Sequence, residues 1–562
     1  MPKNLALPDY FSDVPSLRKS ARFLRDSLSS SLTWPLDRVN ELGDDYMYGH
    51  TGCVNALSWA REGELLLSGG DDRTVRVWRM DPTNDDPEQP FPFTCRSIIR
   101  TGHRANIFNN KMLPHSTRIA SVAGDHEVRV HDVGDVHSAS HGPETTYSVG
   151  EACTHVIRCH RGAVKRIITE YSPDLFLTVS EDGTVRQHDL RTEHRCGRER
   201  DCPTPIVKVN HELTTMSLSP LTPYQLIVAG ESPYGYLFDR RHTGRFLQEE
   251  WGIPPGSGTS GAYLTTCVRR FGRPRRENSD LSGVSALIGD HITGCKMSAH
   301  NGHEAIFSFS GDAVYLYSTL DDPAEASDAH ASPILPSNET LYTMDEIASN
   351  GSAEAPSHLP DDEDMERDID DLELAAAAED DDHESDASGD NDEDEDADDE
   401  DGDTEDPDYF PKVPTVMPRR RFAGARNIRT VKDVNYLGPT DEFVVSGSDD
   451  GNVFIWRKDD GKLVDILEGD GEVVNVIEGH PSLPLFAVSG IDTTVKLFAP
   501  RPNAERPRRY SRMGEADHIV ENNSRQRGPF QDFSRNMFLN FAAQAGVALA
   551  NDADADLECR NQ

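Results

Sequence analysis

Histidine and aspartate recur at one fixed spacing along this chain of 562 residues, and such pairs could carry out proton-transfer chemistry. In three stretches a histidine stands 22 residues before an aspartate, and an aromatic residue or a histidine follows the aspartate after 6 residues. Catalysis needs one such pair, whereas this pair recurs, so a buried structural hydrogen bond explains it better. We predict structural roles for His50, Asp72, His103, Asp125, His160, Asp182, Asp450 and Asp492.

The segments between these residues have the composition of short β-strands. "CVNALSWA", "LLLSGG" and "TVRVW" alternate in polarity and are rich in β-branched and aromatic residues. "SGGDDRT", "SEDGT" and "SGSDDGN" supply the Asp and Gly that tight hairpin turns require. Each unit therefore predicts one small antiparallel sheet.

Seven such units can be counted along the chain. Two are weaker: one runs from about residue 206 to 241 with Ser232 at the aspartate position, and the other from about 283 to 318. In the last two units Ala425 and Asp470 stand where the opening histidine is expected. The pattern resembles the WD40 repeat family, which implies an all-β, seven-bladed β-propeller over residues 45–320 and 424–499.

The last unit ends at Phe498 and lacks an outer strand, because the following "APRPNAERPRR" cannot form one. We predict that residues 37–48 supply this strand and close the ring. The predicted domains are an N-terminal arm (1–36), blades one to five with the closing strand (37–320), an acidic insertion (321–423), blades six and seven (424–500) and a C-terminal tail (501–562).

The insertion carries most of the net charge of −42. Residues 321–408 contain 37 acidic residues and one basic residue, Arg367, which amounts to −36. Such a segment buries too little apolar surface to fold, so we predict disorder. It could serve only as a solvated tether, or it could attract basic partners such as histone tails.

Flanking segments suggest helices and transport signals. Residues 13–30 and 529–550 each place apolar residues on one helical face, which could pack on the ring or on a partner. Basic clusters at 269–276, 419–421 and 501–512 could direct nuclear import. The N-terminus has no apolar run typical of a signal peptide, and nine scattered cysteines favour free thiols, so we expect the nucleus and/or the cytoplasm.

Motifs for catalysis and cofactor binding are missing from the sequence. There is no P-loop, HExxH, GxSxG or zinc-type Cys/His spacing. "GSGTSG" at 256–261 matches a dinucleotide-binding pattern by letter, but no strand precedes it and no helix pattern follows it. We expect no enzyme activity, cofactor, metal, membrane span or sequence-specific nucleic-acid binding.

One further motif occurs in two neighbouring units and not elsewhere at the same register. "QHDLRTE" contains Asp189 and Arg191, and "LFDRRHT" contains Asp239 and Arg241, directly after the last inner strand of each unit. An Asp at a strand end can hold an Arg fork in a set direction, and Arg is enriched at interface anchors. The pairs could form a partner-binding patch, or they could only fix inter-blade loops.

These Asp-x-Arg boxes resemble those of the substrate receptors of cullin-4 ubiquitin ligases, the DDB- and cullin-associated factors. "GHTGCVNALSWAREGELLLSGGDDRTVRVW" and "EGHPSLPLFAVSGIDTTVKLFAP" are similar to the branch of factors five, six and eight. The resemblance implies that Arg191 and Arg241, oriented by Asp189 and Asp239, contact the adaptor of the ligase. His188 and Phe238 stand where the family usually has Trp.

Two functions follow as hypotheses. The first is a substrate-recognition subunit whose partners are the cullin-4 ligase adaptor, the cullin and a protein substrate. The alternative is a nuclear chromatin- or histone-binding scaffold that uses the acidic insertion. A third hypothesis is a generic assembly platform in RNA or ribosome biogenesis.

Overall fold

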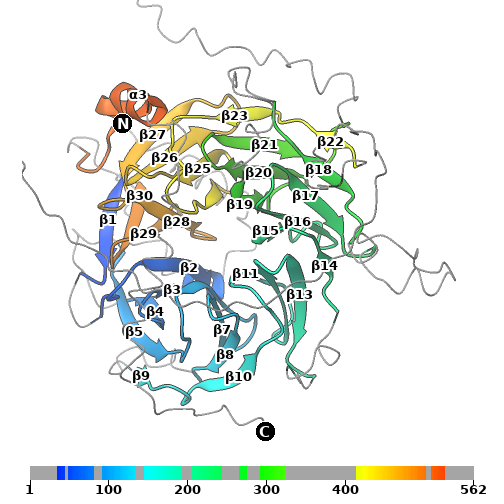
Figure 1. The fold of residues 1–562 in the computed structure, drawn as a ribbon. Coiled ribbons are helices and arrows are strands. Elements are labelled where there is room, and N and C mark those ends of the chain that lie inside the picture. Colours follow the sequence, from blue (N-terminus) through cyan, green and yellow to red (C-terminus); the bar gives the residue numbers. More distant parts are fainter. Residues whose placement is uncertain are drawn as a thin grey trace, which may run out of the picture. The chain divides into compact units, whose positions relative to one another are not determined.

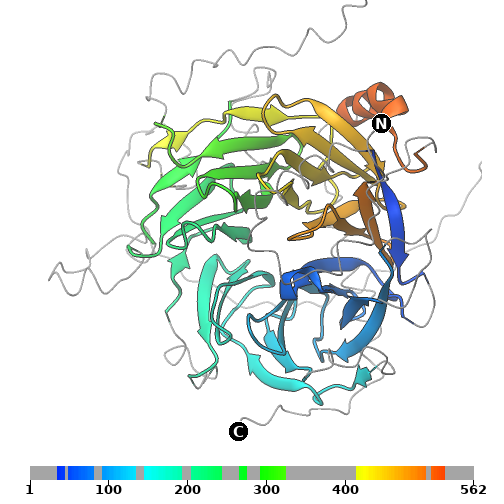
Figure 2. The ribbon, with the colours of Figure 1, turned by 180° about the vertical axis from the view of Figure 1, so that it is seen from behind.

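The computed structural model describes residues 35–44, 48–81, 91–134, 145–192, 196, 204–242, 265–274, 291–323, 410, 413–500 and 508–525. Over these residues the chain forms seven small sheets that follow one another around a ring (Figure 1). Seen from behind, the same sheets surround the same centre (Figure 2). The predicted seven-bladed β-propeller is therefore confirmed. The predicted helices at 13–30 and 529–550 and most of the acidic insertion lie outside the described residues.

Blades one to three come from residues 54–208, and the alternation of buried and more exposed residues is clearest along Phe93–Arg100. Blade one is β2 (Val54–Ala60), β3 (Leu65–Gly70), β4 (Thr74–Met80), β5 (Phe93–Arg100) and β9 (Thr145–Tyr147), with the 3-10 turn η3 (Arg61–Gly63). Blade two is β6 (Ile107–Met112), β7 (Arg118–Ala123), β8 (Val128–Asp132) and β10 (Cys153–Ile157). Blade three is β11 (Val164–Thr169), β12 (Leu175–Ser180), β13 (Thr184–Asp189) and β14 (Val207–Lys208).

Blades four and five each take their outermost strand from beyond the acidic insertion. Blade four is β15 (Leu213–Leu218), β16 (Gln225–Gly230), β17 (Gly235–Asp239), β18 (Arg269–Phe271) and the parallel β22 (Thr415–Val416). Blade five is β19 (Ile292–Met297), β20 (Glu304–Phe309), β21 (Val314–Ser318) and β23 (Arg420–Phe422). The predicted boundary at residue 423 is therefore wrong, because residues 415–422 complete two blades of the ring.

Blades six and seven follow, and the N-terminal strand completes the last one. Blade six is β24 (Val434–Leu437), β25 (Phe443–Gly447), β26 (Asn452–Arg457) and β27 (Leu463–Glu468). Blade seven is β28 (Val474–Gly479), β29 (Phe486–Gly490), β30 (Val495–Pro500) and β1 (Leu36–Leu42).

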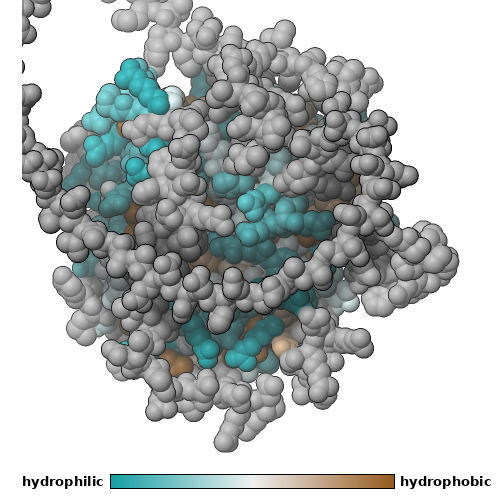
Figure 3. All heavy atoms as spheres, in the orientation of Figure 1, coloured by the Kyte–Doolittle hydropathy of each residue, from teal (hydrophilic) through white to brown (hydrophobic). Residues whose placement is uncertain are grey.

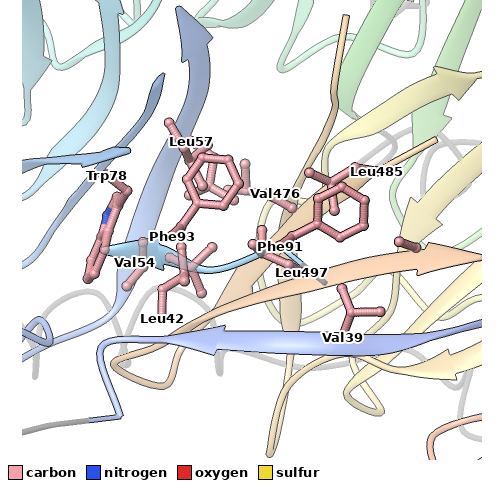
Figure 4. Packing of buried hydrophobic residues seen from close by; sticks show 14 of the residues in the cluster. Val39, Leu42, Val54, Leu57, Trp78, Phe91, Phe93, Val476, Leu485 and Leu497 are labelled. Atoms are coloured by element: carbon pink, nitrogen blue, oxygen red, sulfur yellow. The ribbon is translucent and has the colours of Figure 1, made fainter. Parts of the chain in front are cut away.

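The ring closes where β1 pairs antiparallel with β30, as the sequence predicts. Val39 and Leu42 of β1 pack with Val476 and Leu497 of blade seven in one buried cluster. The cluster continues into blade one, where it includes Trp78 (Figure 4). Closure thus removes a strand edge and joins the first and last blades by a continuous apolar core.

A C-terminal segment crosses the rim of blades six and seven. It contains the 3-10 turn η5 (Met513–Glu515) and the helix α3 (Ala516–Arg525). Its partly buried apolar residues Met513, Ala516, Ile519 and Val520 pack against the core of blade six. No helix within the described ranges has the length and apolar character that crossing a bilayer requires.

The cysteines depart in part from the prediction of free thiols. Cys53, Cys95, Cys159, Cys196, Cys267 and Cys295 are free. Cys153, however, is disulfide-bonded.

Candidate partner-binding site

The recurrent His–Asp pairs lie inside the blades as hydrogen-bonded chains. In blade one, His50 Nδ1 lies 3.0 Å from a carboxylate oxygen of Asp72, and His50 Nε2 lies 2.8 Å from Ser68 Oγ. Trp78 Nε1 donates to the same hydroxyl at 2.8 Å. Four side chains from four parts of the blade are thereby joined, which fixes the turn against the strands.

Blades two and three repeat the arrangement with histidine in place of tryptophan. His103 Nδ1 lies 3.0 Å from Asp125, and His160 Nδ1 lies 3.0 Å from Asp182. In blade three, Thr178 Oγ1 lies 2.7 Å from both His160 Nε2 and His188 Nε2, so the chain is complete. In blade two, Nε2 of His131 is buried without a hydrogen-bond partner.

The protonation states of these chains suit a structural role. Burial lowers the pKa of His50 and His160, so both imidazoles are neutral near pH 7. Burial opposes ionisation of Asp72 and Asp182, but the hydrogen bonds and electrostatic attraction that each carboxylate receives from several neighbours together outweigh burial and lower the pKa of both carboxyls. A buried carboxylate held by a neutral imidazole orders the blade.

The carboxylate of blade six differs from the prediction. Asp449, not Asp450, is fully buried, and it pairs with the buried Lys432 at 2.6 Å. Its other oxygen accepts the backbone N–H groups of Ile428 at 2.7 Å and Arg429 at 3.0 Å. Asp450 instead accepts a hydrogen bond from Asn523 of α3 at 2.8 Å. With no opening histidine in this blade, a lysine neutralises the buried carboxylate.

Blade seven replaces the histidine by a second carboxylate. Asp470 occupies the histidine position, and Lys496 bridges it to Asp492. Asp492 also accepts the backbone N–H of Thr494 at 2.9 Å. One buried lysine thus holds two acidic side chains that would otherwise repel each other.

One group of described residues has the types that bind metal ions. Oxygen and nitrogen atoms of His103, Asp125 and Glu127 lie within 4.8 Å of one another. His103 and Asp125 are already paired, and Glu127 accepts hydrogen bonds from Arg129 and Arg158 at 2.8 and 2.7 Å. Two guanidinium groups against the carboxylate make this group a poor cation site.

The first Asp-x-Arg box lies at the end of β13 and forms a fork. The carboxylate of Asp189 accepts from Arg191 Nε at 2.9 Å and from Nη2 at 2.8 Å. It also accepts the backbone N–H of Arg191 at 3.0 Å, so one carboxylate fixes both the turn and the arginine side chain. The Arg191 side chain is 64% exposed, whereas that of Asp189 is 25% exposed. The arginine is therefore fixed and presented to solvent.

The second box, at the end of β17, repeats this geometry. Asp239 accepts from Arg241 Nε at 2.9 Å, from Nη2 at 2.6 Å and from its backbone N–H at 2.9 Å. The guanidinium of Arg241 also lies 4.0 Å from the ring centroid of Tyr224. The hydrogen bond from Arg241 holds the pKa of Asp239 below its usual value, so the fork stays charged at neutral pH.

The two boxes occupy the same register position in neighbouring blades. Asp189 pairs with Leu175, the first residue of β12, and Asp239 pairs with Gln225, the first residue of β16. Both arginines therefore emerge at the same face of the ring, in the blades that Figure 1 labels β13 and β17. In blade two, Asp132 binds Thr117 and no arginine follows it, so the box is absent there.

Arg240, the middle residue of the second box, joins the two blades. Its guanidinium pairs with Glu170 and donates to Gln187 Oε1 at 3.1 Å, both in blade three. This role of Arg240 was not predicted from the sequence, although two consecutive arginines in the box were a visible signal. This bridge fixes the spacing between the two forks.

Exposed apolar side chains lie on the same face as the forks. Tyr171 is 82% exposed in the loop from β11 to β12, and Leu221 is 56% exposed in the equivalent loop of blade four. In blade five, Ser318 takes the aspartate position and Leu320 takes the arginine position, where it is 69% exposed. Apolar residues beside fixed charges are typical of the core of a protein interface.

The basic clusters are used within the ring. Arg273 and Arg421 both pair with the buried Asp312 of blade five. Arg419 pairs with Asp321 at 2.5 Å, and Arg508 pairs with Asp465. These ion pairs give part of each basic cluster a structural role that does not depend on nuclear import.

Comparison with known proteins identifies the repeats and several relatives. The family model for the WD domain, G-beta repeat, matches residues 45–79, 151–189 and 418–457. The chain is 35% identical over 281 residues to the WD repeat protein iqw1 of Schizosaccharomyces pombe, covering 49% of this chain and 32% of that protein. It is 31% identical over 279 residues to DDB1- and CUL4-associated factor 6 of Homo sapiens, covering 49% of this chain and 28% of that protein.

A plant protein shows a similar degree of likeness. Protein ALTERED SEED GERMINATION 2 of Arabidopsis thaliana is 28% identical over 316 residues, covering 52% of this chain and 37% of that protein. The matches thus span about a third of the length of these curated relatives. A WD40 propeller with such relatives indicates a scaffold or receptor.

Proposed function

This chain is a WD40-repeat protein related to the DDB1- and CUL4-associated factors, and we propose that it is a substrate receptor of a cullin-4-type ubiquitin ligase. The observation that carries the proposal is the pair of exposed arginine forks at one register position in adjacent blades. The adaptor of the ligase would bind this face, and another surface would hold the substrate. The receptor would raise the effective concentration of substrate beside the conjugating enzyme and supply no chemistry of its own.

The physical case rests on preorganisation. Each arginine is held by two side-chain hydrogen bonds and by the turn that its own backbone N–H makes, so binding costs little side-chain entropy. Each fork still has free donors for a partner carboxylate or carbonyl, since a guanidinium carries five N–H groups. The neighbouring Tyr171, Leu221 and Leu320 supply apolar area that arginines alone lack.

The first experiment is affinity purification of tagged full-length protein beside an Arg191→Glu/Arg241→Glu variant, with quantitative mass spectrometry. Recovery of the adaptor and cullin-4 with the wild type, and their loss with the variant, would support the proposal. Arg457→Glu is the control, because Arg457 lies at the end of the corresponding strand of blade six, at the position that Asp189 and Asp239 occupy in their blades, and its side chain is 55% exposed. Absence of both partners from the wild-type sample would reject the receptor function.

A second variant separates the apolar contacts from the charges. Leu320→Asp should weaken binding of purified adaptor about tenfold or more while both forks remain intact, because it places a charge in a buried interface. Val464→Asp is the control, since Val464 is also exposed but lies on the outer strand of blade six. Equal binding by both variants would restrict the interface to the arginines.

The acidic insertion favours a second candidate function. Its 37 acidic residues could attract histones or other basic proteins, which would suit a chromatin-binding scaffold in the nucleus. Deletion of residues 361–408 should then remove histone binding, and binding by the intact chain should fall steeply with added salt. Unchanged histone binding after the deletion would exclude this use of the segment.

We also propose that the protein works in the nucleus and/or the cytoplasm, where cullin-4 substrates would be met. Fluorescence microscopy of the tagged full-length chain tests this proposal. Secretion or retention in the endoplasmic reticulum would contradict it.

A further inference from the structure

Residues 508–525, here called the C-terminal clasp, hold the ring at the seam between blades six and seven. Ser511 forms an antiparallel bridge with Leu467 at the outer edge of blade six. Around it, Glu468 N donates to Tyr510 O at 2.9 Å, and Arg512 N donates to Ile466 O at 2.7 Å. The clasp thus pairs with the outer edge of this blade at a single bridge residue.

The clasp also binds the ring-closing strand. Asp37 of β1 is fully buried and accepts the backbone N–H groups of Arg509 at 3.2 Å and Tyr510 at 3.0 Å. The guanidinium of Arg38, the next residue, lies 3.7 Å from the ring centroid of Tyr510. One segment therefore touches both the last strand of blade six and the strand that closes blade seven.

The side chain of Ser511 lies at the centre of these contacts. Its hydroxyl donates to Asp465 Oδ1 at 2.9 Å, and Arg508 Nη2 donates to the same carboxylate oxygen at 2.9 Å. Arg508 also contacts the hydroxyl of Ser511. The Asp465 side chain is only 4% exposed, and besides the backbone N–H of Ile466 at 3.0 Å the two clasp residues compensate its carboxylate.

The sequence around Ser511 is a recognition pattern as well as a structural one. Arg508 and Arg509 stand three and two residues before Ser511 in "RRYS". Serine kinases of the basophilic class choose substrates by such charge patterns. Arg508 and Ser511 cannot serve Asp465 and a kinase at the same time, so recognition requires the clasp to open locally.

We propose that Ser511 is a phosphorylation site for a basophilic serine kinase, and that its phosphorylation releases the C-terminal clasp from blades six and seven. The Ser511 Oγ–H proton passes to the base of the kinase, a bond forms from Oγ to the γ-phosphorus of ATP, and ADP leaves. A hydroxyl that donates to Asp465 thereby becomes an anion of nearly two charges facing a buried carboxylate. Repulsion and lost hydrogen bonding prevent the clasp from binding again.

Release would uncover a defined part of blade six. Ile519 and Val520 of α3 pack on its core, and Asn523 donates to Gly424 O at 2.9 Å. The outward side of α3 is hydrophilic, at the upper left of Figure 3, so the apolar side faces the blade. Opening therefore exposes an apolar strip and frees the side chains of Arg508 and Arg512.

The test uses the full-length chain, ATP and the purified catalytic subunit of cyclic-AMP-dependent protein kinase, followed by site mapping and hydrogen-exchange mass spectrometry. Phosphate at Ser511, with exchange about tenfold faster or more at 465–468 and 510–525, is the expected result. Ser511→Ala should remove the phosphate, and Arg509→Ala should slow its transfer without loosening the clasp. The absence of phosphate at Ser511 of the full chain would overturn the site.

A second variant tests release without the kinase. Ser511→Glu should raise exchange in the same two segments, whereas Ser524→Glu, on the exposed side of α3, should leave it unchanged. Unchanged or slower exchange in phosphorylated protein and in Ser511→Glu would overturn release, since the anion would then be held by Arg508 and Arg512. The proposal is independent of adaptor binding, which concerns blades three to five.

Discussion

The guanidinium of Arg240 in blade four forms an ion pair with Glu170 in blade three. Arg240 stands between Asp239 and Arg241, so this contact ties the second arginine fork to the blade that carries the first. The proposed adaptor site is therefore two forks at a fixed separation. A partner that binds both at once depends on that separation.

Replacing Arg240 by alanine tests the importance of this spacing. Arg240→Ala should weaken adaptor binding about fivefold, equivalent to about 1 kcal/mol, although both forks keep their own hydrogen bonds. Biolayer interferometry with purified adaptor measures the change. Arg457→Ala removes an exposed arginine of blade six and should have no effect. Equal affinity of Arg240→Ala and wild type would show that the forks act independently.

The hydrogen-bonded chain of blade one should carry measurable stability. Ser68 is fully buried and accepts from Trp78 at 2.8 Å, with His50 Nε2 also 2.8 Å away. Ser68→Ala leaves buried polar atoms unpaired and should lower the free energy of unfolding by about 2 kcal/mol. Urea denaturation of the two proteins measures this loss. Ser148→Ala, at an exposed turn, should stay within about 0.5 kcal/mol of wild type.

The buried ion pair of blade six should behave asymmetrically. Lys432→Met leaves the buried Asp449 carboxylate without a counter-charge and should lower the free energy of unfolding by about 3–5 kcal/mol. Lys432→Met/Asp449→Asn should recover much of this loss, because an amide oxygen still accepts the N–H groups of Ile428 and Arg429. Urea denaturation midpoints of the wild type, the single variant and the double variant measure both effects. A double variant as unstable as the single one would show that the charge is not the cause.

Mild acid should destabilise the ring through its buried histidines. Burial lowers the pKa of His131 to about 3 and the pKa of His211 and His480 to about 4, from 6.5. Below pH 6.5 the unfolded chain therefore binds protons that the folded chain does not, so stability falls as pH drops from 6.5 towards 4. Each such histidine contributes a slope of up to about 1.4 kcal/mol per pH unit.

The control for this slope is His131→Phe, which removes one titrating group whose Nε2 has no hydrogen-bond partner. Its unfolding free energy should depend less on pH between 6.5 and 5 than that of wild type. Asp465 acts in the opposite direction, since burial raises its pKa to about 6 and stabilises the folded state as pH falls below that value. Asp465 is present in both proteins, so its effect cancels in the comparison. Equal slopes would contradict the assignment to His131.

The spacing of His, Asp and aromatic residues was enough to predict the ring, because blades one to three share the buried His–Asp pair and blades six and seven keep the spacing from aspartate to aromatic residue. The same rule placed the blade-six carboxylate at Asp450, which lies 6 residues before Trp456. The interior holds Asp449 instead, because Lys432 and the N–H groups of Ile428 and Arg429 converge on it. Which of two consecutive aspartates turns inward depends on those distant partners.

Other features gave no periodic signal. β22 and β23 have two and three residues, too few for alternation to be visible, and their burial comes from the neighbouring strands β18 and β21. α3 is a polar decapeptide that is helical beside the core of blade six. The Asp-x-Arg boxes could be predicted from the sequence because the aspartate accepts the backbone N–H of the residue two positions later, which fixes the spacing.

The placement of β1, β22 and β23 has a consequence for a chain cut within the acidic insertion. The N-terminal fragment would contribute β1 to blade seven, and the C-terminal fragment would contribute β22 and β23 to blades four and five. Each piece would thus hold strands that the other needs, at both junctions of the ring. Because each fragment completes blades of the other, a single proteolytic cut in the insertion should leave the two fragments associated. The two fragments should also assemble into the ring by strand complementation when they are co-expressed.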